Sequence, residues 1–94
     1  MADVEKPEGQ KPLIEYPTSY TFKVMGTQAG FRQVVEALFA RLMGRQLPPE
    51  ALVEKPSSGG KYVSISVTVE LHSEEQRRGI YAEIHQEKRI VYYL

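Results

Sequence analysis

Cysteine and tryptophan are both absent from the 94-residue sequence. The lack of cysteine excludes disulfides, thiolate nucleophiles, iron–sulfur clusters and cysteine zinc sites, and it fits a reducing compartment. No run approaches the roughly 18 apolar residues that a transmembrane helix needs, and the N-terminus has no apolar stretch resembling a secretory signal. We therefore expect a cytoplasmic protein that does not associate with membranes.

An excess of charge of either sign is also missing. Twelve lysines and arginines balance twelve aspartates and glutamates, and no block of five like charges occurs. Nucleic-acid binders usually carry a basic excess, so the composition argues against a nucleic-acid partner. A chain of this length has room for one core, and any ligand site is expected to be shallow or shared between subunits.

The first twelve residues differ in composition from the rest. The segment MADVEKPEGQKP is rich in charge, proline and glycine, and Val4 is its one sizeable aliphatic side chain. Such a segment buries too little apolar surface to offset the entropy of ordering. Residues 1–12 are therefore predicted to form a disordered tail, and residues 13–94 a single domain.

Alternation of apolar and polar residues predicts the strands. It is clear in residues 19–25 and clearest in residues 61–71, and shorter strands fit residues 51–55 and 90–94. The turn-rich residues 57–60 are expected to join the second and third strands as a hairpin.

Apolar residues at helical spacing predict two helices. The first has a stripe formed by Phe31, Val34, Val35, Leu38, Phe39 and Leu42, with Arg32 and Glu36 paired on its solvent side, Thr27 as a cap and Gly44 at its end. The second follows Ser73, whose spacing to Gln76 is typical of a capping box. Its inward face is expected to carry Ile80, Tyr81 and Ile84.

This order, β-α-β-β-α-β, predicts an α+β ferredoxin-like fold. Right-handed crossovers place both helices on one face of a four-stranded antiparallel sheet, and the other face stays open. Strict alternation places on the open face Thr21, Lys23, Tyr62, Ser64, Ser66, Thr68, Val91 and Tyr93. This face is the leading candidate for a binding surface.

Two segments resemble a known family. YPTSYTFKVMG at residues 16–26 and KPSSGGKYVSISVTV at residues 55–69 are similar to the YbeD-like family of small uncharacterised bacterial proteins. The resemblance covers nearly all of residues 13–94 and implies a ferredoxin-like fold similar to ACT regulatory domains. It implies no established activity, although likeness to ACT domains suggests small-molecule regulation or contacts between subunits.

Two glycine-containing loops are candidate ligand sites. In the loop between the second and third predicted strands, side chains and glycine amides can together hold an anion. The side chains are Lys55, Ser57, Ser58 and Lys61. The loop is not a Walker A motif, because lysine stands where the first glycine is required. In the turn between the first predicted strand and the first predicted helix, backbone amides between Gly26 and Gly30 can bind a small effector. The alternative is that both are ordinary turns with solvated side chains.

No catalytic or metal-binding arrangement is recognisable. His72 and His85 are the only histidines and are expected to be solvated. Neither belongs to a nucleophile motif, and the adjacent Glu74 and Glu75 fit helix capping better than paired acid–base chemistry. We expect a protein that is not an enzyme and has no cofactor.

Three readings of function remain open. The first is a regulatory or protein-interaction module that binds a protein partner, or a second copy of itself, through the open face. The second is an ACT-like sensor of a small metabolite near residues 26–30 or 57–61. The third is RNA binding, which ranks last because the central strands lack the stacking aromatics of RNA-recognition motifs.

Overall fold

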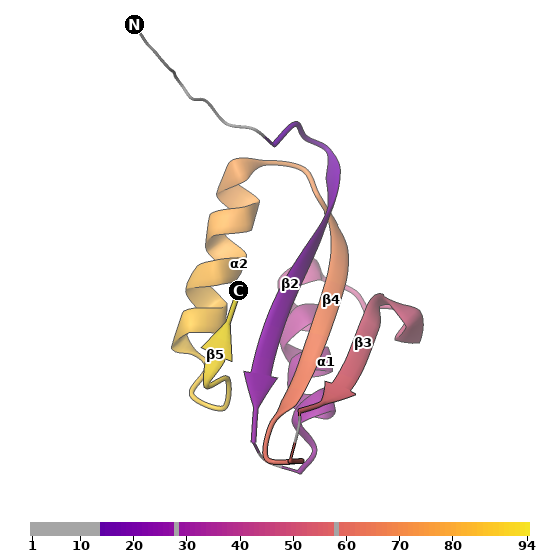
Figure 1. Cartoon of the computed structure of the whole chain (residues 1–94). Coiled ribbons are helices and arrows are strands. Elements are labelled where there is room, and N and C mark those ends of the chain that lie inside the picture. The colour runs from indigo at the N-terminus through magenta and orange to yellow at the C-terminus, as the bar shows by residue number, and fades with distance from the viewer. Residues whose placement is uncertain (1–13, 28, 58) are drawn as a thin grey trace, which may run out of the picture.

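The computed structural model describes residues 14–27, 29–57 and 59–94, so the predicted tail and Ser58 lie outside the described residues. Its elements are β2 (Thr18–Gly26), α1 (Phe31–Met43), a 3₁₀ turn η2 (Pro49–Ala51), β3 (Leu52–Pro56), β4 (Val63–Leu71), α2 (Glu74–Gln86) and β5 (Tyr92–Tyr93). The strands form one sheet in the order β3-β4-β2-β5, antiparallel throughout (Figure 1). The predicted β-α-β-β-α-β fold is confirmed. Along the described part of the chain, no helix is long and apolar enough to cross a membrane.

The centre of the sheet is the pair formed by β2 and β4. All nine residues of β2 lie opposite residues of β4, from Thr18 opposite Leu71 to Gly26 opposite Val63. Buried residues alternate with exposed ones along both strands, as the sequence pattern predicts. One face of this pair is therefore covered by the helices, and the other face is left open.

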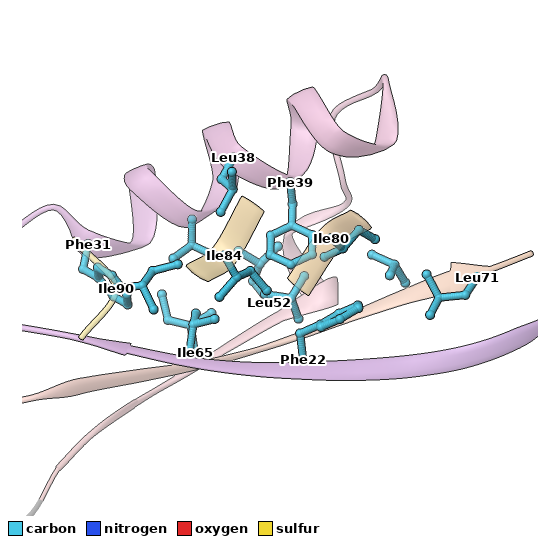
Figure 2. Packing of buried hydrophobic residues seen from close by; sticks show 14 residues of the cluster. Phe22, Phe31, Leu38, Phe39, Leu52, Ile65, Leu71, Ile80, Ile84 and Ile90 are labelled. Atoms are coloured by element: carbon cyan, nitrogen blue, oxygen red, sulfur yellow. The ribbon is translucent and has the colours of Figure 1, made fainter. Parts of the chain in front are cut away.

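The core lies between the sheet and the helices (Figure 2). It contains Phe22, Val24, Phe31, Val35, Leu38, Phe39, Leu52, Ile65, Val67, Val69, Leu71, Ile80, Ile84 and Ile90. No polar or charged side chain of the described residues is fully buried. Burial of apolar surface is therefore the main force that holds the helices on the sheet, and no ion pair among these residues is buried.

Glycines set both ends of α1. Gly30 is the N-cap with φ of 80°, and Gly44 is the C-cap with φ of 75°, a left-handed conformation that glycine adopts without strain. The predicted cap at Thr27 is wrong, because the helix begins four residues later, at Phe31, and its N-cap makes no side-chain hydrogen bond. The predicted pair of Arg32 and Glu36 is present, with Nε and Oε2 3.0 Å apart.

The N-terminus of α2 is capped by side chains. The Ser73 Oγ accepts a hydrogen bond from the Gln76 amide at 3.0 Å, which confirms the forward half of the predicted capping box. The Gln76 Oε1 accepts from the His72 amide at 2.7 Å, one residue before the position that a capping box uses. Ile80 and Ile84 are buried, as predicted.

We expect Gly79→Ala to stabilise the protein. Gly79 lies in the exposed middle of α2, and a Cβ added there would meet no heavy atom within 4 Å. Alanine in a helix is more stable than glycine by about 0.5 to 1 kcal/mol, so the free energy of unfolding should rise by about that amount. Urea denaturation followed by circular dichroism measures it, and an unchanged midpoint would contradict the expectation.

The last strand is shorter than predicted and in a different register. β5 consists of Tyr92 and Tyr93 only, and Tyr93 lies opposite Val24, whose side chain is in the core. Opposed residues share a face, so Tyr93 faces the helices, and its hydroxyl lies 3.1 Å from Nδ1 of His85. The predicted place of Tyr93 on the open face is wrong. Val91 precedes the strand, so its predicted place on the sheet is wrong too.

The wrong placement of Val91 and Tyr93 has a physical cause. Ile90 is buried, which makes residues 90, 92 and 94 look like the inward face of a regular strand. However, Ile90 lies in a turn, where its amide donates to the carbonyl oxygen of Glu87. Alternation starts only after that turn, and a shift of one residue exchanges the two faces.

The hairpin between β3 and β4 is also longer than predicted. β4 begins at Val63, and Tyr62 belongs to the loop, where its amide donates to Oγ of Ser57 at 2.9 Å. The Ser57 amide donates in turn to the carbonyl oxygen of Tyr62 at 2.8 Å. The predicted place of Tyr62 on the sheet is therefore wrong. β3 starts at Leu52, one residue later than predicted, because Ala51 belongs to η2.

Candidate functional site

The open face of the sheet carries two rows of side chains that run from β3 across β4 and β2 to the residues of the C-terminal edge. Pairing between strands places Val53, Ser66 and Lys23 side by side, and Leu94 continues this row through two backbone hydrogen bonds with Lys23. The second row consists of Lys55, Ser64, Met25 and Tyr92. We call these eight residues the open-face site.

Apolar groups lie at three of the four ends of the rows, and Lys55 is the fourth. Val53, Tyr92 and Leu94 are exposed by 57%, 54% and 59%. Val53 belongs to one edge strand, whereas Tyr92 and Leu94 lie at the opposite edge. Tyr92 and Leu94 therefore make a small exposed apolar patch at one edge, and Val53 is a single exposed apolar side chain at the other.

The charge of the open-face site is positive. Lys23 and Lys55 are exposed and belong to neighbouring rows, and neither row contains an acidic side chain. Glu70 is on the same face but lies further along β4, opposite Ser19. Between Glu70 and the rows lies the pair of Thr21 and Thr68, whose hydroxyl oxygens are 2.9 Å apart.

The structure brings together the predicted residues Lys23, Ser64, Ser66 and Thr68. It adds four residues that the sequence reading missed, namely Met25, Val53, Tyr92 and Leu94. Lys55, predicted both as the end of a strand and as a ligand of the loop, lies opposite Ser64 within β3 and belongs to this face. Alternation along β3 was the signal that could have found Val53 and Lys55.

The loop after β3 is built by glycine geometry. Gly59 and Gly60 have φ of 87° and 73°, which is the conformation that such a turn requires. Lys61 is exposed, with its Nζ 5.6 Å from the centre of the Tyr62 ring. Lys55 and Ser57 flank the turn on the other side. Anion binding by this loop stays a prediction.

In the turn from β2 to α1, the Phe31 ring packs directly against Gly26. Gly26 is buried, and a Cβ added to it would lie 2.3 Å from the Phe31 ring. Gly26 is therefore needed for close packing of the first residue of α1 against the end of β2. Gly30 provides the left-handed N-cap. An effector at this turn stays a prediction.

A network of polar side chains ties α2 to β2 and to the residues before it. Glu74 accepts two hydrogen bonds from Arg77, at 2.7 and 3.0 Å, and one from the Tyr16 hydroxyl at 2.7 Å. Arg77 also lies 3.4 Å from the Tyr20 hydroxyl, which is 3.0 Å from that of Tyr81. These bonds from Arg77, and then that from Tyr16, lower the pKa of Glu74 to about 2. Burial, followed by the hydrogen bond to Tyr20, raises the pKa of Tyr81 to about 12.

This network predicts acid sensitivity. The pKa of Glu74 is about 2 in the folded protein against an ordinary value of 4.5, so folding favours its ionised form. Its contribution to stability is complete above about pH 5 and is lost as the pH falls from 4.5 towards 2. In urea denaturation at pH 6 and pH 3, Glu74→Gln should reduce the difference in stability between the two pH values.

One further variant completes this test. Glu87, whose pKa the Arg89 side chain lowers to about 2, retains its own share of the acid sensitivity in the Glu74→Gln protein. The exposed neighbour Glu75 provides the matched control, and Glu75→Gln should leave the pH dependence close to that of the unmodified protein. Equal effects of the two variants would contradict the assignment to Glu74.

A groove of about 490 Å³ lies elsewhere, between α1 and the turn after α2. Its floor includes Val34 and Leu38, and Arg41 and Arg89 lie at its rim. Both arginines are paired with carboxylates, Arg41 with Glu83 and Arg89 with Glu87. In the described ranges, no three side chains of histidine, aspartate or glutamate gather where a metal ion would bind.

The fold and this surface define a class of protein: a small α+β domain of ferredoxin-like topology with one uncovered sheet face. The family model described as "Protein of unknown function (DUF493)" matches residues 11–94, and the chain belongs to this family. The resemblance to YbeD-like proteins is thereby confirmed.

Curated relatives and a solved structure agree with this assignment. A UPF0250 protein from Erwinia tasmaniensis is 41% identical over 76 residues, covering 79% of this chain and 83% of the relative. The UPF0250 protein YbeD from Escherichia coli O1:K1 is 38% identical over 74 residues, covering 77% and 80%. The solution structure of protein HP0495 from H. pylori has a TM-score of 0.66 and 25% identity, covering 93% of this chain and 91% of that one.

Proposed function

We propose that the protein is an interaction module that binds an acidic protein partner through the open-face site. One observation carries the proposal. Lys23 and Lys55 lie in adjacent rows that contain no acidic side chain, and three of the four row ends are the exposed side chains of Val53, Tyr92 and Leu94. Opposite charge steers a partner to such a face and fixes its orientation, and desolvation of the apolar ends supplies affinity.

The composition of the site fits a modest, polar interface. Serines 64 and 66 occupy the middle of the two rows and are partly buried. Small hydroxyl side chains at the centre allow a partner to approach the sheet closely, while the lysines and apolar groups surround them. Interfaces of regulatory complexes often have this mixture of polar and apolar contacts.

Charge reversal tests the proposal. We expect Lys23→Glu and Ser64→Glu to keep the fold, because both residues are on the open face, and to release an acidic protein that the unmodified domain retains from lysate of its source cells. Lys55→Glu should have the same effect. Lys88→Glu is the matched control, since Lys88 is exposed in the turn after α2 and lies off this face.

The outcomes separate the proposal from its alternatives. Retention should also weaken as salt is raised, because exposed charges are screened. A partner that binds the Lys23→Glu, Lys55→Glu and Ser64→Glu proteins as well as the unmodified one would place the site elsewhere. A metabolite sensor would instead show ligand-dependent thermal stabilisation, which grows with the ratio of ligand concentration to dissociation constant.

A further inference from the structure

The two edges of β2 are paired very differently. Along one edge, β4 pairs with all nine residues, whereas β5 pairs along the other edge only with Val24 and Met25. Leu94 extends this second contact by hydrogen bonds to Lys23. In the part of the chain that the structure describes, no strand pairs with Thr18–Phe22 on this side. Figure 1 shows β5 beside only the lower part of β2, with α2 running on beyond it.

The direction of the backbone groups on this edge follows from the bonds that β5 makes. Lys23 both donates to Leu94 at 3.2 Å and accepts from it at 2.8 Å, and the carbonyl of Met25 accepts from Val91. In an antiparallel ladder, alternate residues point their amide and carbonyl to the same side. The amides and carbonyls of Thr21 and Ser19 therefore point outward at the unpaired edge.

Aromatic side chains border this edge on the helix face. Tyr20 packs edge-on against Tyr81, with ring centres 6.3 Å apart, and the Tyr81 ring centre lies 6.0 Å from that of Tyr93. All three tyrosines are only partly buried. The Arg77 guanidinium lies 5.8 Å from the centre of the Tyr20 ring and 5.6 Å from that of Tyr81.

We propose that the unpaired edge of β2, from Thr18 to Phe22, binds an extended segment of the partner as an added antiparallel strand in line with β5. This inference rests on the proposed function and names how the partner binds. The outward amides and carbonyls of Ser19 and Thr21 have the spacing that pairs with another extended backbone. The Ser19 carbonyl also accepts a hydrogen bond of 3.3 Å from the Thr18 hydroxyl and keeps a second lone pair for such pairing. The added strand would border the open-face site, so one partner segment contacts both surfaces.

The faces of the sheet define the sequence of that segment. Residues opposite Phe22 and Tyr20 face the tyrosines and are expected to be apolar, by continuation of the pairing in which Tyr93 lies opposite Val24. Residues opposite Thr21 and Ser19 face the open side. A carboxylate opposite Thr21 is diagonal to Lys23, within reach for an ion pair.

A second copy of the chain fits this edge less well. Two β2 edges paired antiparallel are related by a two-fold axis perpendicular to the sheet, so both α2 helices would lie on the same face. Paired strands are about 4.8 Å apart, whereas a helix with its side chains is about 10 Å wide. Because α2 runs beside this edge (Figure 1), two copies would bring their helices into the same space.

An extension of the full chain tests the edge directly. Val-Glu-Val-Thr-Val appended after Leu94 places valines opposite Phe22 and Tyr20 and polar residues opposite Thr21 and Ser19. We expect amide hydrogen exchange at Thr21 and Ser19, measured by NMR, to slow about tenfold or more relative to the unmodified chain. The control extension Glu-Val-Glu-Val-Thr reverses the faces and should give little protection.

A free peptide tests binding in trans. Acetyl-Val-Glu-Val-Thr-Val-amide should shift the amide resonances of Ser19 and Thr21 in the unmodified protein and not in the extended chain, whose edge is occupied. Thr21→Pro removes an outward amide and no backbone hydrogen bond to β4, so it should abolish the shift at Ser19; the hydroxyl contact with Thr68 is lost in Thr21→Ala as well. Thr21→Ala keeps the amide and should preserve the shift.

Three other outcomes of these exchange, peptide-binding and sedimentation experiments would overturn the proposal. Unchanged exchange in the extended chain would show that the edge does not accept a strand, and equal peptide binding by Thr21→Pro would place the peptide elsewhere. A dimer in sedimentation that Thr21→Pro dissociates would assign the edge to a second copy. These results leave the charge-reversal test of the open-face site unaffected, so failure of the edge and failure of the proposed function are distinguishable.

Discussion

Gly26→Ala is expected to destabilise the protein by about 2 to 3 kcal/mol, the upper range for overpacking a core. An added Cβ would lie 2.3 to 2.8 Å from three atoms of the Phe31 ring. The ring cannot simply swing away, because Phe31 is 2% exposed and packed within the core. In a domain of this size, each kcal/mol lowers the melting temperature by about 4 to 8 °C, so a fall of about 10 °C or more is expected.

A double variant separates the steric cause from other effects. Phe31→Leu removes the ring atoms that the alanine methyl group would meet, so the two substitutions together should cost less than the sum of the single changes. Gly79→Ala is the control for the substitution itself and has the opposite expected sign. Strict additivity of Gly26→Ala and Phe31→Leu would show that the clash with the ring is not the cause.

Phe22→Ala is expected to lower the free energy of unfolding by about 3 to 5 kcal/mol. Phe22 is fully buried in the central strand, and its ring packs against one aromatic residue from each helix. Its centre lies 5.7 Å from that of Phe39 in α1 and 4.8 Å from that of Tyr81 in α2. Removal of the ring leaves a cavity where sheet and both helices meet, and single domains have only about 5 to 15 kcal/mol of stability.

The measurement compares neighbouring positions on the same strand. Urea denaturation of Phe22→Ala should show a large fall in the midpoint, whereas Thr21→Ala, on the open face, should lose about 1 kcal/mol or less, mainly the hydroxyl contact with Thr68. Phe22→Leu, which keeps part of the volume, should fall between the two. Equal losses at Phe22 and Thr21 would contradict the assignment of Phe22 to the core.

The fold was predictable because its main elements follow simple periodicities. Alternation in residues 61–71 and helical spacing from Phe31 to Leu42 both report burial on one side, and burial dominates the energetics of so small a domain. The start of α1 was not predictable in this way. It depends on the left-handed N-cap at Gly30 and on the fit of Phe31 against Gly26, and neither is reported by alternation or helical spacing.

The candidate site was predictable in its centre and not at its ends. Lys23, Ser64 and Ser66 lie on long strands, where alternation fixes the face of each residue. Tyr92 lies on a strand of two residues that follows a turn, Leu94 comes directly after that strand, and Ile90, which precedes it, is buried outside the strand. Short edge strands therefore need the pairing itself before their faces can be assigned.

The central pairing of β2 with β4 also bears on how the chain folds. The two strands are separated in sequence by α1, η2 and β3, so their ladder closes a long loop, whereas β3 and β4 are joined by a short hairpin. Long-range pairings of this kind slow folding because loop closure precedes the stabilising contacts. We therefore expect the hairpin of β3 and β4 to form early and the docking of β2 to limit the folding rate. During synthesis β2 emerges first, and it remains without either neighbour until the second half of the domain has been made.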